Sequence, residues 1–378
     1  MSGAGPSQAA NCAPSGGSAA AKSQAWGDHA SGAGPTELAL LIGALDAAAA
    51  RLPPPRYYRI AGEVLAIHAG ARAEAMLEAF SALRTDERRA ALDIFILDGV
   101  ADGLALPETA IARRDVATPG GLGAFADGGV RAFSQPDAGV LSVLDEPRRR
   151  AYCALRDVAA LPYYEFAAPL RHILQWWMLG RGGALLHSAA IGSHEGGVLI
   201  VGPSGSGKST TALACQEAGL GFTSDDYVLV AAGNPPTAHM AYSTAKIVRA
   251  NLGAHRNYER HFRNLARTDE KPMMFMHEVA PERVLTSFPV RAIVLPVVAG
   301  AGTTRIVRAG AAELLRALAP SSILLFPLAG ATAFRRIADL CRALPCLRAE
   351  LAADPRDVAD AFARLINNGG TIDLAAAA

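Results

Sequence analysis

A glycine-rich turn is the clearest chemical feature of the sequence. It reads Gly202-Pro203-Ser204-Gly205-Ser206-Gly207-Lys208-Ser209 and lies between an apolar run at 197–201 and a helical pattern that begins at Thr210. This is the pattern GxxxxGK followed by Ser or Thr, in which glycines let the backbone curl around a phosphate with its N–H groups turned inward. Lys208 supplies a point charge for the β- and γ-phosphates, and the Ser209 hydroxyl can ligate Mg²⁺. The sequence therefore predicts that residues 202–210 bind a purine nucleotide, ATP, together with Mg²⁺.

Two adjacent aspartates, Asp225 and Asp226, are the second candidate for chemistry. Asp225 lies 17 residues after Lys208, and both aspartates precede the apolar run at 227–230. Neighbouring carboxylates at the start of a strand point to opposite faces of it. One can then hold or orient a metal ion while the other accepts the proton of a substrate hydroxyl. An exposed pair in a turn before a strand is the alternative interpretation.

Other motifs of nucleotide-hydrolysing proteins are missing. The sequence has no LSGGQ-like signature of ABC-type ATPases and no NKxD motif of GTPases. The apolar run at 293–298 could be the strand of a Walker B motif, but no acidic residue ends it. Asp225 and Asp226 therefore remain the candidates for metal and proton chemistry.

Together with His187, these motifs resemble the HPr kinase/phosphorylase family. That family combines a Walker A loop with a downstream Asp-Asp pair and an upstream histidine, and His187 lies 15 residues before Gly202, on the expected strand before the loop strand. The resemblance implies an ATP-dependent kinase that acts on a serine of a protein or peptide. It implies a catalytic set of Asp225, Asp226, His187 and Lys208. Asp225 is assigned as general base and Asp226, with Ser209, to the metal side, with the exchange of these two roles as the alternative, and His187 orients the aspartates. A structural core histidine is the alternative for His187.

The chain as a whole is similar to the HPr-kinase-like peptide kinases of lasso-peptide biosynthesis, which modify ribosomally made precursor peptides. The stretches that carry this similarity are 58–62, 169–171 with Trp176 and Trp177, 243–246, 277–278, 281–283 and 291–296. The similarity implies as partner a precursor peptide with an acceptor C-terminal serine, or a small protein that carries an acceptor serine. It also favours a homo-oligomer. Two alternatives stay open, namely a regulatory kinase that acts on HPr and a P-loop module that binds ATP without transferring phosphate.

Lysine is rare in this chain. Of the 36 Lys and Arg residues, only four are lysines, namely Lys22, Lys208, Lys246 and Lys271. A compact ammonium group can approach a phosphate or carboxylate end-on, which a planar guanidinium cannot. We therefore predict that Lys246 and Lys271 contact phosphate or the acceptor peptide. Glu278 is a further candidate, for a metal or water shell beside the substrate.

The elements that must position these residues indicate an α/β fold. We predict a P-loop kinase domain of the HPr kinase C-terminal type at 161–368, after a small N-terminal α/β domain at 56–160. Residues 1–55 form a tail rich in Ala, Gly, Ser and Pro that contains one short helix, and 369–378 form a second tail. Because such tails bury little apolar area, we expect them to be disordered.

Local patterns give four further expectations. The short helix of the N-terminal tail runs from residue 37 to about residue 51, and a single helix occupies 162–181 with Trp176 and Trp177 as packing anchors. The glycine-rich stretch 119–129 is expected to be a loop. A short strand is expected at 323–325.

The composition excludes several classes of protein. A net charge of +1 gives no overall positive field that would attract nucleic acid. The sequence contains no run of 18 strongly apolar residues, the length needed to span a membrane. We see no secretory signal pattern. The five cysteines are odd in number and form no CxxC pair, which fits free thiols in a reducing compartment. We therefore expect a cytoplasmic protein without nucleic-acid or membrane partners.

Overall fold

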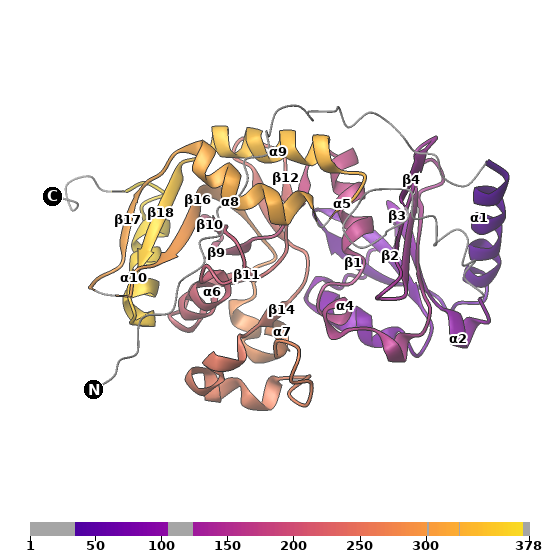
Figure 1. The fold of residues 1–378 in the computed structure, drawn as a ribbon, viewed down its shortest axis with the longest axis horizontal. Coiled ribbons are helices and arrows are strands. Elements are labelled where there is room, and N and C mark those ends of the chain that lie inside the picture. The colour runs from indigo at the N-terminus through magenta and orange to yellow at the C-terminus, as the bar shows by residue number, and fades with distance from the viewer. Residues whose placement is uncertain (1–34, 105–123, 301, 325, 373–378) are drawn as a thin grey trace, which may run out of the picture. The chain divides into compact units, whose positions relative to one another are not determined.

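Two main β-sheets organise the chain (Figure 1). The structure, a computed structural model, describes residues 35–104, 124–300, 302–324 and 326–372. These residues belong to one compact unit, Ser31–Ala378. Strands and helices are mixed along the chain, which confirms the predicted α/β class. The predictions for residues 1–34 and 373–378 lie outside the described residues.

The first sheet has seven strands in the order β1-β2-β3-β7-β6-β5-β4. β3 is parallel to both β2 and β7, and the remaining neighbours are antiparallel. The strands are β1 (Arg56–Ile60), β2 (Glu63–Ala69), β3 (Leu92–Asp98), β4 (Ala124–Asp127), β5 (Val130–Gln135), β6 (Val140–Asp145) and β7 (Arg150–Leu155).

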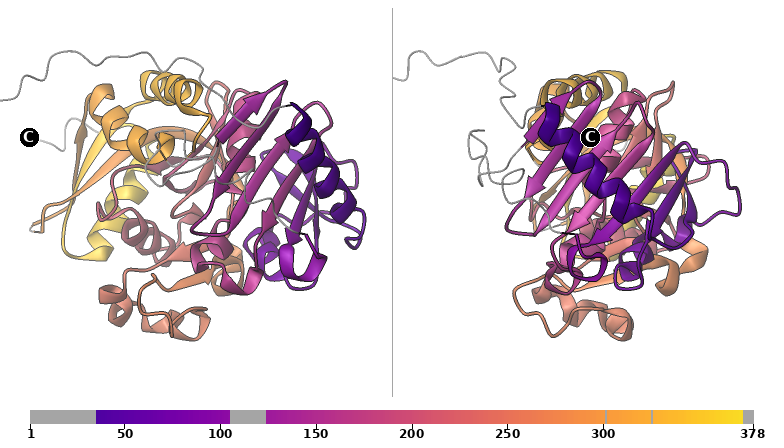
Figure 2. Two further views of the ribbon diagram at one scale, coloured as in Figure 1. Left: turned by 45° about the vertical axis from the view of Figure 1, so that its right-hand side comes forward. Right: turned by 90° about the vertical axis from the view of Figure 1, so that its right-hand side faces the viewer.

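Both faces of the first sheet are covered. Side chains alternate along a strand, so Ile94 and Ile96 of β3 join one core cluster while Phe95 and Leu97 join another. Helix α1 (Pro35–Ala49) lies across the sheet on the face of Phe95 and Leu97 (Figure 2). The other face packs against elements that share the first cluster, namely η1 (Glu74–Leu83), η2 (Val158–Ala160), α4 (Tyr163–Ala167) and α5 (Arg171–Gly180). A short helix, α2 (Gly99–Asp102), follows β3.

The second sheet has nine strands. Three of them are parallel to one another, and the glycine-rich turn follows one of these three. Seven strands follow the order β11-β9-β10-β16-β13-β12-β8, while β18 pairs with β16 and β17. β10, β16 and β18 are parallel to one another. The strands are β8 (Ala184–Leu186), β9 (Ala189–Ser193), β10 (Gly196–Ile200), β11 (Gly221–Ser224), β12 (Val228–Ala231), β13 (Thr237–Met240), β16 (Ser287–Val298), β17 (Arg305–Arg308) and β18 (Cys346–Leu351).

Alternation along β10 again explains how helices cover the second sheet. Val198 and Ile200 belong to the core beneath α6 (Lys208–Glu217) and α10 (Pro355–Asn367). Leu199 and Val201 belong to the core beneath α8 (Ala311–Ile323) and α9 (Gly330–Ala343). β10 is therefore buried on both faces, as the apolar run at 197–201 predicts.

A separate two-stranded sheet is formed by residues between β13 and β16 in the sequence. β14 (Thr244–Lys246) pairs antiparallel with β15 (Met273–Phe275). The connection between them contains η3 (Arg249–His261). The short helices α7 (Met276–Val279) and η4 (Pro281–Arg283) follow β15.

Three local predictions need correction. The helix expected at 162–181 is broken into α4 and α5, because Pro169 lacks an N–H and Leu170 adopts a left-handed φ of 61°. Residues 124–127 of the expected loop form β4, paired with β5, and residues 119–123 lie outside the described part. Ile323 is the last residue of α8 and Leu324 is also helical in its dihedrals, so no strand begins there; Leu325 lies outside the described part.

Other local predictions agree with the structure. The short helix of the N-terminal tail is α1, two residues earlier at each end than expected. Trp176 and Trp177 are buried packing residues. The predicted domain borders at 55/56 and 160/161 stay predictions. Within the described ranges, no helix is both long enough and apolar enough to cross a membrane.

Candidate active site

The glycine-rich turn lies where the three parallel strands end. The Val201 N–H donates to Val294 O at 2.9 Å, so the pairing of β10 with β16 continues up to the turn. A Cβ atom on Gly207 would lie 3.2 Å from Leu351, the last residue of β18, and 3.8 Å from Val298, the last residue of β16. Open α/β sheets bind ligands at such carboxyl-terminal strand ends.

Glycine is required at both ends of this loop. Gly202 has a φ of 151°, and a Cβ atom there would lie 2.7 Å from Ser206 Oγ. Gly207 has a φ of 101° and is the N-cap residue of α6, and its carbonyl accepts the N–H of Thr211 at 2.9 Å. The first turn of α6 therefore begins directly beneath the loop, while Pro203, Ser204, Gly205 and Thr210 are exposed. This geometry presents backbone N–H groups and a helix N-terminus to a ligand.

Lys208 is buried within the loop. Its Nζ donates to Gly202 O at 2.7 Å and to Pro203 O at 3.1 Å. Burial lowers the pKa of Lys208, and the positive charge of Lys271 adds to this effect, while the charge of Asp226 opposes it. Lys208, Lys271 and the aspartates are therefore within electrostatic range of one another.

Asp225 and Asp226 connect β11 to β12. The Ser224 Oγ donates to Tyr227 O at 2.7 Å and accepts the N–H of Asp226 at 3.2 Å, which fixes the turn that carries the two carboxylates. The Asp225 side chain is buried, with 1% of the residue surface exposed. The Asp226 side chain is 21% exposed.

Asp226 is held by a partner on each of its two oxygens. His187 Nε2 lies 2.8 Å from Asp226 Oδ1, and Lys246 Nζ lies 2.6 Å from Asp226 Oδ2. Burial alone would raise the pKa of Asp226, but the charge of Lys246 and the hydrogen bond of His187 outweigh burial and hold the pKa well below its ordinary value. Asp226 is therefore ionised at neutral pH.

Asp225 has the opposite environment. Burial, together with the charge of Asp226, raises the pKa of Asp225 to about 7, although Lys246 and the Ser209 hydroxyl counteract this rise. Its Oδ2 accepts the backbone N–H of Lys246 at 2.8 Å. Its Oδ1 is buried and has no hydrogen-bond partner among the described residues.

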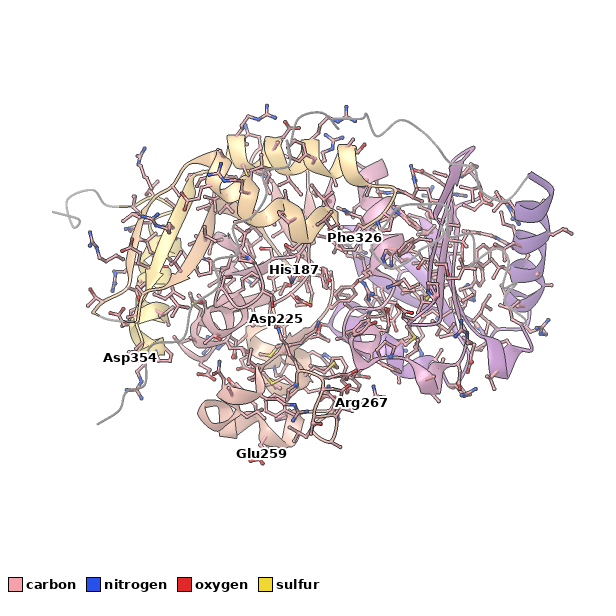
Figure 3. All side chains as sticks on the ribbon, in the orientation of Figure 1. His187, Asp225, Glu259, Arg267, Phe326 and Asp354 are labelled. Carbon is pink, nitrogen blue, oxygen red and sulfur yellow. The ribbon has the colours of Figure 1, made fainter. Side chains whose placement is uncertain are left out.

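His187 does not lie on a strand, in contrast to the prediction. It lies in the connection between β8 and β9, because β8 ends at Leu186 and β9 begins only at Ala189. The His187 N–H donates to Ser322 Oγ at 3.0 Å, and its ring lies 5.4 Å from the ring of Tyr227. His187 and Asp225 are labelled in Figure 3. Nothing in the sequence pattern indicated Ser322 or Tyr227 as neighbours of the site.

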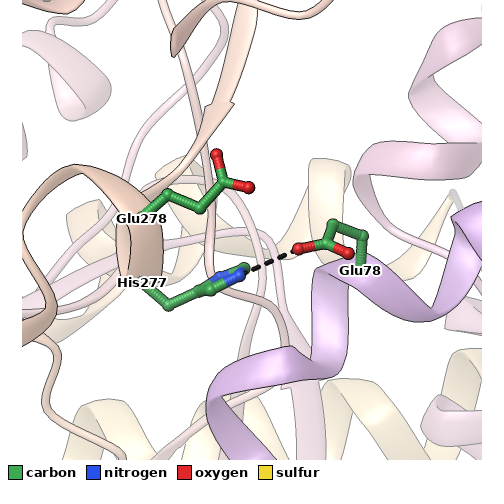
Figure 4. A group of neighbouring side chains, drawn as sticks. All are labelled: Glu78, His277 and Glu278. Carbon is green, nitrogen blue, oxygen red and sulfur yellow. Dashed lines mark hydrogen bonds and ion pairs between the residues drawn. The ribbon is translucent and has the colours of Figure 1, made fainter.

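Glu278 is placed apart from the aspartates. It forms an ion pair with Arg263 and lies beside His277 and Glu78 (Figure 4). His277 Nε2 is 3.0 Å from Glu78 Oε1, and its Nδ1 is 2.7 Å from Ser243 Oγ. Lys271 is exposed just before β15. The structure thus brings Lys246 into contact with Asp226 and Lys271 close enough for its charge to act on Lys208. Glu278 instead pairs with Arg263.

The residues present fit ATP and Mg²⁺. Ser206 Oγ and Thr211 Oγ1 are buried without a hydrogen-bond partner in the described part of the chain, as is Asp225 Oδ1. Ser206 belongs to the loop and Thr211 to the first turns of α6, and nothing lies within 4 Å of a Cβ position at Gly205, so a ligand can approach the loop backbone there. The Ser209 hydroxyl and the two carboxylates are the hard oxygen donors that Mg²⁺ prefers.

Comparisons with known proteins give distant structural likenesses only. No family model matches the sequence, and no curated protein does. Among solved structures, the chain is similar to the HPr(Ser) kinase/phosphatase from Coxiella burnetii. The match has 12% sequence identity and a TM-score of 0.28, and it covers 49% of this chain and 94% of that chain. The function must therefore be inferred from the residues of the site.

Proposed function

We propose that the protein is an ATP-dependent kinase that transfers the γ-phosphoryl group to a serine hydroxyl of a peptide or protein. The observation that carries this proposal is the meeting of the phosphate loop and the aspartate pair. Asp226 and Asp225 act electrostatically on Lys208, and the Ser209 hydroxyl acts on Asp225. A phosphate donor held by the loop would therefore lie next to the Asp225 carboxylate.

The residues of the loop bind and orient the donor in this proposal. Backbone N–H groups of residues 202–209 and the Lys208 ammonium hold the phosphates. Ser209 and Asp226 would hold Mg²⁺, which neutralises charge on the phosphate oxygens when bound. Asp226 suits this role because it is ionised, and a carboxylate has more lone pairs than its two partners use.

Asp225 is the proposed general base. A base is most effective when its pKa lies near the working pH, and burial brings Asp225 into that range. Its Oδ1 is the free oxygen that can accept the proton of an incoming serine hydroxyl. His187 and Lys246 keep Asp226 in place beside it.

The proposed acceptor is the C-terminal serine of a lasso-type precursor peptide. Its support is the similarity in sequence stretches such as 58–62 and 243–246 to kinases of that kind. A kinase acting on HPr differs only in the acceptor, so both acceptors belong in the same assay.

Replacement of Lys208 tests the proposal at its first step. Lys208→Ala removes the ammonium that faces the phosphates, so we expect weaker ATP binding and the loss of phosphoryl transfer to serine peptides. The measurement is mass spectrometry of the peptide after incubation with ATP and Mg²⁺, alongside calorimetric titration of ATP. Full transfer by the variant would rule out the proposed role of the loop. ATP binding by the wild type without transfer to any serine would instead favour a binding module.

A further inference from the structure

Lys246 makes two contacts with the aspartate pair, one from its backbone and one from its side chain. Its N–H donates to Asp225 Oδ2 at 2.8 Å, and its Nζ donates to Asp226 Oδ2 at 2.6 Å. These distances are those of good hydrogen bonds, and the side-chain bond joins two charged groups. A single residue thus fixes one oxygen of each carboxylate.

These contacts determine which oxygen atoms of the two carboxylates have hydrogen-bond partners. His187 contacts Asp226 Oδ1, whereas Lys246 contacts Asp226 Oδ2. On Asp225, Lys246 holds Oδ2, while Oδ1 has no partner among the described residues. The Lys246 N–H therefore fixes the position of Asp225 Oδ2 and limits the orientations open to Oδ1.

Lys246 lies on a short strand that is held by its pairing with β15. Lys246 pairs with Met273 across the β14–β15 ladder, and the next N–H, that of Ile247, donates to Pro272 O at 2.9 Å. The Lys246 side chain is 18% exposed. A short strand with few free torsions is a better support for a positioning group than a mobile loop.

The anchors on the other side come from the segments that pack on the first sheet. Thr244 Oγ1 donates to Ala167 O at 2.8 Å in α4. The Ser243 N–H donates to Ala79 O at 2.9 Å in η1. Tyr242 OH donates to Pro169 O at 2.8 Å. The first sheet and its helices therefore fix the strand from which Lys246 reaches the aspartates.

We propose that Lys246 is a positioning residue of the active site, which orients Asp225 and Asp226 for proton acceptance and metal binding and does not itself bind phosphate. This inference rests on the proposed kinase function and adds a role for η1 of the N-terminal region, whose Ala79 carbonyl holds Ser243 directly before β14. An Arg at this position would keep the charge but would place a larger planar group beside Asp226.

Substitution of Lys246 tests this assignment, because kcat and the Kd for ATP are measured separately. Lys246→Met keeps the backbone bond to Asp225 but removes the Nζ bond to Asp226. We expect the released Asp226 to shift within the aspartate pair, so that kcat falls by about 10²-fold while the Kd for ATP stays unchanged. Lys246→Arg should recover little of this loss. Arg342→Met, which removes an exposed cation paired with Asp339, is the matched control and should behave like the wild type. An unchanged kcat, or a Kd that rises in step with the loss of kcat, would overturn the inference.

A double-mutant cycle keeps this test separate from the test of the kinase function. Lys246→Met, Asp226→Asn and the double variant are compared by Tm, which needs no activity. We expect the sum of the two single-variant losses in Tm to be larger than the loss in the double variant, because each substitution breaks the same contact. Additive losses in Tm would contradict the positioning role. A wild type that transfers no phosphate would refute the kinase function alone.

Discussion

Asp225 and Asp226 are adjacent in the chain, yet their environments are opposite. Asp226 is ion-paired with Lys246 and hydrogen-bonded to His187, so its charged form is favoured. Asp225 is buried, lies next to the negative charge of Asp226 and has a raised pKa. Pairs of carboxylates whose pKa values are driven apart are typical of sites that divide proton transfer and charge stabilisation between two residues.

The raised pKa of Asp225 predicts a pH-dependent cost to folding. Folded Asp225 takes up a proton at higher pH than the unfolded carboxyl, so stability falls as the pH rises through the window between the ordinary carboxyl pKa and about 7. Asp225→Asn should therefore raise the free energy of unfolding at pH 8, by on the order of 2–4 kcal/mol. The gain should vanish towards pH 4. Thermal unfolding in magnesium-free buffer across this range measures it.

Asp226→Asn is the natural comparison, and its expected sign is reversed. Because the pKa of Asp226 is lowered, its charge stabilises the fold above the ordinary carboxyl range, and this contribution is lost only as the pH falls through the folded value. Asp226→Asn should therefore lower Tm at pH 8. Equal shifts of the same sign in both variants would contradict the assigned environments.

At the scale of elements, the unit β10–loop–α6 is local in sequence, and this explains why it could be predicted. The strand, the glycines and the helix all lie within residues 196–217 and need no distant partner to be recognised. The division of 162–181 into α4 and α5 was not predicted, because apolar spacing continues through Pro169 and Leu170. Backbone conformation at Leu170 depends on packing that the pattern does not contain.

The loop predicts a specific effect of substitution at Gly202. An added Cβ would lie 2.7 Å from Ser206 Oγ, and the positive φ of residue 202 is unfavourable for any residue with a side chain. Gly202→Ala should therefore distort the loop and weaken ATP binding by at least about tenfold. Isothermal titration with ATP and Mg²⁺ measures the effect. Gly253→Ala is the control, because nothing lies within 4 Å of a Cβ there. Equal affinity in both variants would mean that the loop does not surround the nucleotide.

At the scale of the molecule, the site depends on contacts between distant parts of the chain. Lys246 reaches Asp226 from 20 residues away, and Ser322 meets the backbone of His187 from 135 residues away. The sequence could single out Lys246 as a rare lysine, but it could not show that a carboxylate is its partner. Glu278 was a reasonable candidate by residue type, yet folding places it against Arg263. Residue types were thus predictable, while their pairing follows from the packing of the two sheets and the segments between them.

The rate of phosphoryl transfer by Asp225→Asn, measured together with its affinity for ATP, tests the central claim most directly. The wild type should add one phosphoryl group to a serine peptide in the presence of ATP and Mg²⁺. Asp225→Asn should bind ATP as the wild type does and transfer phosphate at least about 10²-fold more slowly, the usual contribution of a general base. Transfer at the wild-type rate by Asp225→Asn would contradict the account.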